Sequence, residues 1–196
     1  MFEFGLKAFD ARKAEESIRS AFYEVKDLLD VTEQEINFFV NEDLIREFQE
    51  RRVSKFTELK ELKADLQLRF RDYRIEGRIK SLTSLLGKHM KSRKLLDTFG
   101  LKIIVGSIYE CYAMKDWILR RYNLFEMKDR IEEPCPNGYR DIKLTVEYEN
   151  TYLEFIIQTP QMYVDSHTLQ PHNAKYPWKY HPAILGLPGE YGPIYF

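Results

Sequence analysis

The sequence predicts an α+β domain, in which a mixed or antiparallel sheet is flanked by helices and preceded by a helical N-terminal part. Three observations support this fold class. Apolar residues recur at helical spacing through residues 1–70, a compact apolar run follows at Leu101–Val105, and two alternating stretches lie close together at Ile142–Tyr148 and Tyr152–Thr159. A strand, a helix and a hairpin after a helical section indicate segregated helices and strands.

Three apolar stripes mark the expected N-terminal helices. The first is formed by Ile18, Phe22, Val25 and Leu29. Thr32 followed by Glu35 is a capping box, which predicts a second helix continuing through Ile36 to Leu44. A third stripe extends from Val53 to Phe70. We interpret all three as core packing and assign them no chemistry.

The pattern changes after Gly77. Leu82–Met90 predicts a short helix, Leu101–Val105 a buried strand, and Ser107–Tyr122 a second helix with apolar residues at helical spacing. The two alternating stretches that follow predict a hairpin, because only Glu149, Asn150 and Thr151 separate them. From Pro160 onward we expect mostly loop with one short helix.

Composition limits the class of protein. With 196 residues and 44% hydrophobic residues, the chain can build one domain with a real core, or one domain with a helical extension. It contains no apolar run of about 18 residues, so no membrane span is expected. Met1–Asp10 lacks the features of a signal peptide. Cys111 and Cys135 have no metal-ligand spacing, which predicts free thiols in a reducing compartment, the cytoplasm.

Positive charge is concentrated in the middle of the chain. Residues 78–130 carry 12 Lys and Arg against 5 Asp and Glu, although the whole chain has a net charge of −1. Such an asymmetry suits a polyanionic ligand. A solvated basic helix face would give the same count, and charge alone does not separate the two interpretations.

Two isolated acids lie in apolar surroundings. Asp97 precedes the expected strand at Leu101–Val105, and Glu154 lies inside the apolar run Tyr152–Ile157. A carboxylate in an apolar strand is costly unless it is paired or bound to a metal. Periodicity alone favours the exposed face of an edge strand for Glu154. The other interpretation is that acids on neighbouring strands hold a hard cation through oxygen ligands.

Cations and an aromatic ring accompany these acids. Arg78 and Lys80 alternate in an extended segment, so both can clamp phosphates, and Ser81 is placed to cap the helix that follows. Tyr139 follows Asn137-Gly138 at a turn, where it can either stack on a base or pack on its own strand. Together these features indicate magnesium-dependent phosphoryl chemistry on a nucleotide.

Five segments carry a family resemblance. They are Gly77–Ser81, Asp97–Val105, Lys128–Ile131 leading to Pro134–Tyr139, Glu154–Thr159, and Trp178–Tyr180. Each is weak alone, but they come in the order and rough spacing of RelA/SpoT synthetase domains, which the chain resembles over roughly residues 45–180. The resemblance implies a nucleotidyltransferase-like fold, with a helical N-terminal extension at 1–44, a synthetase domain at 45–180 and a Pro/Gly-rich tail at 181–196.

The resemblance also implies a reaction. Enzymes of this family move the β,γ-pyrophosphate of ATP onto a ribose 3′-hydroxyl, and Mg²⁺ is the implied cofactor. Asp97 and Glu154 would be catalytic and hold the metal, and Glu154 would help to deprotonate the attacking hydroxyl. The implied ATP-binding residues are Arg78, Lys80, Ser81 and Lys88. The implied acceptor-binding residues are Asn137, Gly138, Tyr139 and Lys143.

Several positions depart from the family pattern. Lys143 replaces the usual His, Lys102 replaces an Arg after the metal-binding Asp, and Cys135 replaces a loop Lys. Ile156 and Gln158 stand where the family has Gln and Arg. The residues of the ATP side are kept, whereas the acceptor side is altered, so the acceptor is less certain than the reaction.

Two acceptors therefore stay open. The leading hypothesis is a small alarmone synthetase that uses GDP or GTP and makes the (p)ppGpp of the stringent response. The rival is a toxin-type relative that modifies the 3′ end of tRNA and is neutralised by an antitoxin, with Arg51, Arg52 and Lys55 as further phosphate contacts. A third hypothesis, an inactive nucleotide-binding module, is disfavoured by the retained acids. The sequence leaves the oligomeric state open.

Overall fold

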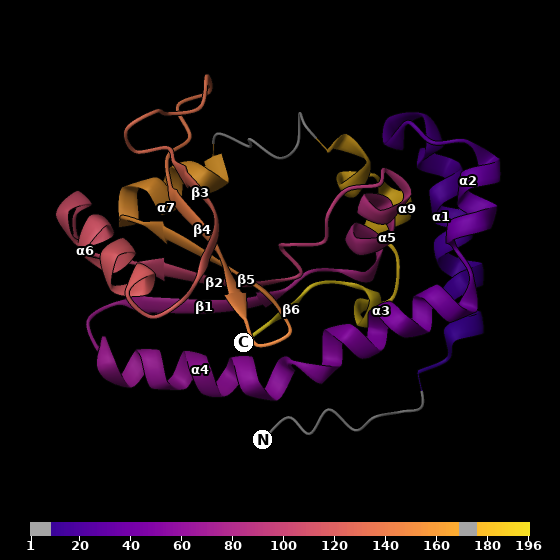
Figure 1. Ribbon diagram of the computed structural model, residues 1–196. Helices are drawn as coiled ribbons and strands as arrows, with labels where there is room; N and C mark the ends of the chain where they lie inside the picture. The colour runs from indigo at the N-terminus through magenta and orange to yellow at the C-terminus, as the bar shows by residue number, and fades with distance from the viewer. Residues whose placement is uncertain (1–8, 169–175) are drawn as a thin grey trace.

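The computed structural model describes residues 9–168 and 176–196, which contain a mixed sheet flanked by helices (Figure 1). Within these residues the sheet has six strands in the order β3-β4-β5-β2-β1-β6. The strands are β1 (Arg74–Ile79), β2 (Phe99–Ile104), β3 (Leu124–Asp129), β4 (Ile142–Tyr148), β5 (Thr151–Gln158) and β6 (Ile194–Tyr195). β2 and β5 run parallel, and the other neighbours are antiparallel. The α+β class with a mixed sheet is confirmed.

The helices surround this sheet and extend beyond it. In chain order they are α1 (Ala11–Leu29), α2 (Glu33–Phe39), α3 (Glu42–Ser54), α4 (Phe56–Arg69), α5 (Leu82–Met90), α6 (Ile108–Leu119), α7 (Pro160–Thr168) and α9 (Pro182–Leu185), with 3₁₀ turns η1 (Pro177–Tyr180) and η2 (Gly189–Tyr191). None of the helices in the described part of the chain is both long and apolar enough to cross a bilayer.

The prediction for the second N-terminal helix is wrong in one respect, because two helices form where one was expected. The capping box at Thr32 and Glu35 forms, but the helix ends at Phe39 and a new helix, α3, begins at Glu42. The cause is Asn41, whose side-chain oxygen accepts a hydrogen bond from the Leu44 amide at 2.9 Å and caps α3. Val53 consequently belongs to α3, and the third stripe becomes α4.

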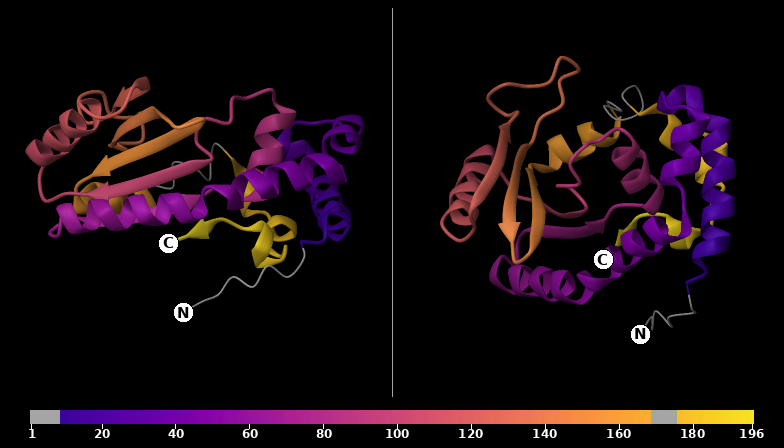
Figure 2. Two further views of the ribbon diagram at one scale, coloured as in Figure 1. Left: turned by 60° about the horizontal axis from the view of Figure 1, so that its bottom comes forward. Right: turned by 45° about the vertical axis from the view of Figure 1, so that its right-hand side comes forward.

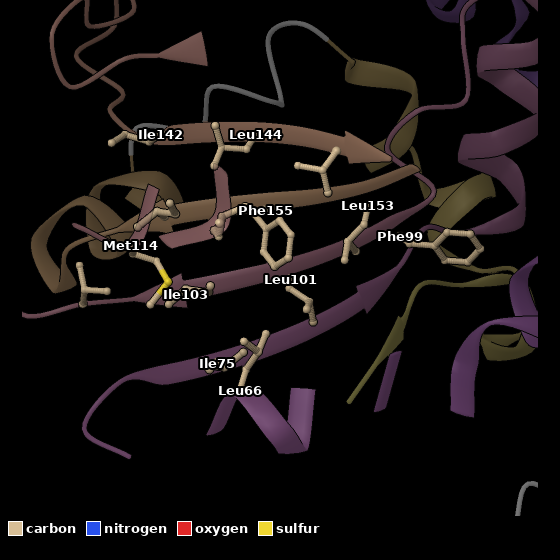
Figure 3. Close-up of a cluster of buried hydrophobic side chains, with 14 of the residues drawn as sticks. Leu66, Ile75, Phe99, Leu101, Ile103, Met114, Ile142, Leu144, Leu153 and Phe155 are labelled. Atoms are coloured by element: carbon tan, nitrogen blue, oxygen red, sulfur yellow. The ribbon is translucent and has the colours of Figure 1, made fainter. Parts of the chain in front are cut away.

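Apolar side chains gather in two clusters. The sheet core lies under one face of the sheet, where Leu66 of α4 and Met114 of α6 pack on Leu101, Ile103 and Phe155 (Figure 3). The helical core joins α1, α3 and α5 to the C-terminal segment; its members include Ile18, Phe22, Phe48, Leu86 and Trp178. In Figure 1 the sheet lies on the left and these helices on the right.

The other face of the sheet is polar because side chains alternate across the strands. Register places Arg78, Gly100 and Glu154 side by side in one row, and Glu76, Lys102 and Ile156 in the next. Helix α7 lies on this side, opposite α6, as the right-hand view of Figure 2 shows. Its Tyr163 donates a hydrogen bond from Oη to Glu76 at 3.2 Å. Arg78 and Glu154, two of the residues expected in the site, lie in the first of these rows.

Three strands and one helix differ from the expectation. β1 was expected only as an extended segment, β3 lies at the edge of the sheet with mostly exposed residues, and β6 is two residues long. β1 does alternate, but a glycine takes one of its three buried positions, whereas β3 and β6 contain no fully buried residue. α7 begins directly after β5, since Pro160 occupies its first turn, where proline is well tolerated.

A buried arginine ties the C-terminal segment to the helices. Arg52 on α3 is fully buried, and its guanidinium donates to the carbonyl oxygens of Glu190, at 3.2 Å, and Gly192. The chain then continues into β6, which pairs with Arg78 and Ile79 of β1. The expectation that Arg52 contacts phosphate is therefore wrong, because its guanidinium is buried and donates to these carbonyls and to the Gln49 side chain. Lys55 is also engaged, by Glu58 and Glu149.

Candidate active site

Asp97 lies between two lysines. Lys80 follows β1 and Asp97 precedes β2, and antiparallel pairing continues beyond both strands, because the Lys80 amide donates to the Thr98 carbonyl at 2.9 Å. The Lys80 ammonium binds one carboxylate oxygen of Asp97, and the Lys88 ammonium binds the other at 2.6 Å. Lys88 comes from the last turn of α5. Three residues expected in the site are thus in contact.

The charges of Asp97 and Lys80 strongly affect each other's pKa. Burial alone would raise the pKa of Asp97, but the ammonium groups of Lys80 and Lys88 outweigh it and hold that pKa well below its usual range. Burial lowers the pKa of Lys80 to about 7; Asp97 opposes this shift, and the cations Lys88 and Arg78 add to it. Asp97 is therefore an ionised carboxylate in a site that holds more positive than negative charge.

Glu154 lies on a central strand. β5 stands between β4 and β2, and Glu154 is only 4% exposed. The exposed edge-strand interpretation is therefore wrong. Lys143 of β4 places its ammonium 3.2 Å from a carboxylate oxygen of Glu154. Glu154 is thus a buried acid on a central strand, and the Lys143 ammonium compensates its burial. The interpretation that it holds a metal ion stays a prediction.

Tyr139 is held by a polar network at the end of β5. Its hydroxyl donates to Asp141 at 2.6 Å, and the fully buried Asp141 also binds the Arg130 guanidinium at 2.8 Å. Gln158 Nε2 donates to the Arg140 carbonyl at 3.2 Å and lies 3.5 Å from the Tyr139 hydroxyl. Burial, then Asp141, raises the pKa of Tyr139. The ring is half-buried rather than freely exposed at a turn.

The remaining expected residues have mostly local roles. Ser81 caps α5 by accepting a hydrogen bond from the Ser84 amide at 3.2 Å, as its position in the sequence predicts. Asn137 Oδ1 accepts from the Tyr139 amide at 3.2 Å, and Gly138 has φ +79°, a left-handed value that favours glycine. These two residues shape the turn that presents Tyr139. Arg78 is half-buried in β1.

Three charged residues that sequence reasoning left without a role also belong to the site. Asp141 and Arg130 fix Tyr139, as described above. Burial lowers the pKa of Lys179 to about 8, and the nearby Lys88 and Arg78 lower it further. No local pattern distinguishes these residues from surface charges. The available signal was position within the family segments, since Arg130 lies in Lys128–Ile131 and Lys179 in Trp178–Tyr180.

The two acids offer the oxygen ligands that Mg²⁺ prefers. In residues 9–168 and 176–196, no group of three or more His, Cys, Asp or Glu side chains could hold a metal ion. Mg²⁺ is, however, commonly bound by one or two carboxylates together with substrate phosphates and waters. Asp97 enters β2, Glu154 lies on the neighbouring β5, and both carboxylates are contacted by lysines. These oxygen donors fit Mg²⁺ that binds together with a nucleotide.

Comparison with known proteins places this arrangement in a family. A model of the region found in RelA / SpoT proteins matches residues 77–181. A probable guanosine-3′,5′-bis(diphosphate) 3′-pyrophosphohydrolase of Mycoplasma pneumoniae is 30% identical over 109 residues, which are 53% of this chain. The match spans only 15% of the length of that relative.

Solved structures share the fold. The small alarmone synthetase 1 of Bacillus subtilis bound to its product pppGpp has 23% identity and a TM-score of 0.58, over 67% of this chain and 82% of that one. A GTP pyrophosphokinase family protein of Streptococcus pneumoniae has 22% identity and a TM-score of 0.59, over 67% and 78%. The Bacillus synthetase bound to AMPCPP has 19% identity and a TM-score of 0.51, over 67% and 80%. The family match covers more than half of the chain, which therefore belongs to the RelA/SpoT family.

Proposed function

We propose that this protein is an ATP-dependent pyrophosphokinase that transfers the β,γ-pyrophosphate of ATP to the 3′-hydroxyl of GDP or GTP, making (p)ppGpp and releasing AMP. The observation that carries the proposal is the acid pair, Asp97 and buried Glu154, flanked by Lys80, Lys88 and Lys143 in a chain of this family. Phosphoryl transfer depends mainly on positioning and charge neutralisation, and lysines around two carboxylates supply both.

On the ATP side, the proposed binding groups are the cations that form ion pairs with Asp97 in this structure. Lys80 and Lys88 contact the triphosphate, with Arg78 on the adenine and Ser81 holding the start of α5 beside them. Asp97 and Glu154 would hold Mg²⁺, which when bound neutralises charge on the phosphate oxygens. The lysines bring the phosphates to a fixed place, so that little reorganisation is needed at the moment of transfer.

On the acceptor side, Glu154 accepts the proton of the attacking 3′-hydroxyl. Lys143, whose ammonium lies 3.2 Å from a carboxylate oxygen of Glu154, orients that carboxylate in its buried position. Tyr139 offers its ring to the acceptor base, while Asp141 holds the hydroxyl and so fixes the direction of the ring. Asn137 and Gly138 form the turn that presents the ring.

The test is transfer of label from γ-labelled ATP in the presence of Mg²⁺ to GDP or GTP. We expect labelled (p)ppGpp with the wild type and a loss of at least about 100-fold in kcat with Glu154→Gln. Glu147→Gln, an exposed acid on the adjacent strand β4, is the matched control and should retain activity. Equal activity of Glu154→Gln and wild type would refute the catalytic assignment.

One observation favours a second acceptor, the 3′ end of tRNA. An open groove with a volume of about 430 Å³ lies near the acids: two of its lining residues are Leu96, which precedes Asp97 in the chain, and Tyr152, which is two residues before Glu154 on β5. We call it the aromatic groove. It is lined by Glu47, Phe48, Arg51, His89, Lys94, Leu95, Leu96, Phe125 and Tyr152. Aromatic rings with cations suit single-stranded nucleic acid.

The two acceptors are separated by offering deacylated tRNA in the same assay. Labelling of tRNA but not of GDP or GTP would assign the second function. Binding to tRNA should then weaken steeply as salt rises, whereas binding to a mononucleotide should weaken far less. Label on guanine nucleotides alone would leave the aromatic groove without a role in transfer.

A further inference from the structure

A second pocket lies on the other side of Lys88. It is a small open cleft with a volume of about 50 Å³ between α1, α5 and η1. We call it the cationic pocket. It is lined by Leu28, Leu29, Gly87, Lys88, Lys91, Arg93, Tyr176, Trp178 and Lys179. Four of these described lining residues are cations and none is an acid, so the pocket attracts an anion.

The positive charge of the pocket is only partly balanced. Lys88 shares Asp97 with Lys80, and Lys91 reaches Asp30 at 3.4 Å, where Asp30 is 92% exposed. The Lys179 ammonium lies 4.6 Å from the ring centroid of Tyr176 and 5.4 Å from that of Trp178. Ring faces weakly attract cations but do not neutralise them. An excess of positive charge therefore remains at this end of α5.

Arg93 stands at the mouth of the pocket and is exposed. Its guanidinium carbon lies 5.9 Å from the ring centroid of Tyr176, and NH1 donates to the Tyr176 hydroxyl at 3.4 Å. Tyr176 thus has a cation near its ring from both Arg93 and Lys179. The ring positions the two cations around one space.

The frame that carries Lys179 is rigid. Trp178 is buried and packs so tightly on α5 that a Cβ added at Gly87 would lie 2.9 Å from its ring. Trp178 also meets Phe22 edge-to-face, with ring centroids 6.1 Å apart. Lys179 follows this anchored ring directly, so its ammonium is placed before any ligand arrives.

Burial and neighbouring charge both act on Lys179. Burial lowers its pKa to about 8, Lys88 and Arg78 lower the pKa further, and Asp97 opposes them. The ammonium therefore lies within electrostatic range of the ATP-side cations and of Asp97. An anion bound here would offset the repulsion among these cations, which is part of the cost of keeping them together.

Resting on the proposed function, we propose that the cationic pocket binds part of the phosphate chain of the nucleotide donor, with Lys179 and Arg93 as phosphate-binding residues. Lys88 belongs both to the cluster around Asp97 and to this pocket, so phosphates held at Lys80 and Lys88 can continue to Lys179. The ligand class is a nucleoside triphosphate or an inorganic polyphosphate, which share the same chain of phosphates.

The proposal is tested by equilibrium binding of AMPCPP and of inorganic tripolyphosphate to the full chain, measured by calorimetry. Lys179→Gln should weaken both ligands by at least about tenfold, because a hydrogen bond to a charged group is lost. Lys179→Arg should retain most of the affinity. Lys115→Gln, on α6 and outside the pocket, is the matched control and should bind as the wild type does.

Arg93→Gln gives an independent reading, because Arg93 is exposed and its replacement should leave the fold intact, as thermal unfolding would verify. Unchanged affinity of both Lys179→Gln and Arg93→Gln for both ligands would overturn the pocket while leaving the proposed transfer intact. Weaker tripolyphosphate binding by the variants, in a protein that transfers nothing to any nucleotide, would support the pocket and refute the proposed function. AMP should bind the variants and the wild type alike, since it lacks the phosphate chain.

Discussion

Single residues of the site differ in how far the sequence could predict them. Asp97 and Glu154 stand out because each is a lone acid in an apolar stretch, and Lys80 because it alternates with Arg78. Lys179 and Asp141 have no such local signal: their importance comes from cations and rings that only the fold brings near them. For Glu154 the local pattern was misleading. Periodicity favoured the exposed face of an edge strand, but β5 lies inside the sheet and the residue is buried.

The two cysteines should react very differently with thiol reagents. Cys111 is fully buried on α6, and burial raises its pKa to about 12, so at pH 8 it is protonated and shielded. Cys135 is half-buried in the loop before Tyr139. Titration with a chromogenic disulfide at pH 8 should label one thiol rapidly in the native protein and the second only after unfolding. Rapid reaction of both native thiols would contradict the burial of Cys111.

At the scale of elements, the helices were easier to predict than the strands. α1 and α5 carry strong apolar periodicity, and the hairpin β4–β5 alternates clearly. β1 was expected only as an extended segment and β3 was not expected at all, because a glycine takes one of the buried positions of β1 and β3 is an exposed edge. Their place is set by pairing with distant segments, and no local pattern contains that information.

The loop between β3 and β4 provides a prediction at this scale. Asp141→Asn should raise KM for the acceptor at least about threefold with a smaller change in kcat, because Arg130 and Tyr139 lose the charge that orients them. Steady-state kinetics with varied GDP would measure the change. Glu132→Gln, an exposed acid on the same loop, serves as the control. An unchanged acceptor KM would exclude a role of the network in placing Tyr139.

The stability of the whole molecule depends on Arg52, a buried cation that links α3 to the C-terminal segment. Arg52→Met should lower the free energy of unfolding by about 2–4 kcal/mol, because the carbonyls of Glu190 and Gly192 lose their charged donor in a buried place. Denaturant unfolding would measure the loss. Arg46→Met, at an exposed position of the same helix, should change stability by less than about 0.5 kcal/mol. Equal stabilities of the two variants would show that Arg52 does not hold the C-terminal segment.

The two apolar cores have a consequence for turnover. Glu154, Lys143 and Tyr139 stand over the sheet core, whereas Lys88 and Lys179 are carried by α5 and η1, which pack in the helical core. In the proposed transfer, the acceptor hydroxyl and the pyrophosphate that it receives are therefore held by residues of different cores, and their alignment depends on how the two cores meet. We expect Phe22→Leu, which touches no substrate, to slow single-turnover transfer while leaving ATP affinity nearly unchanged. An unaltered rate of transfer would mean that the sheet alone aligns the two sets of binding residues.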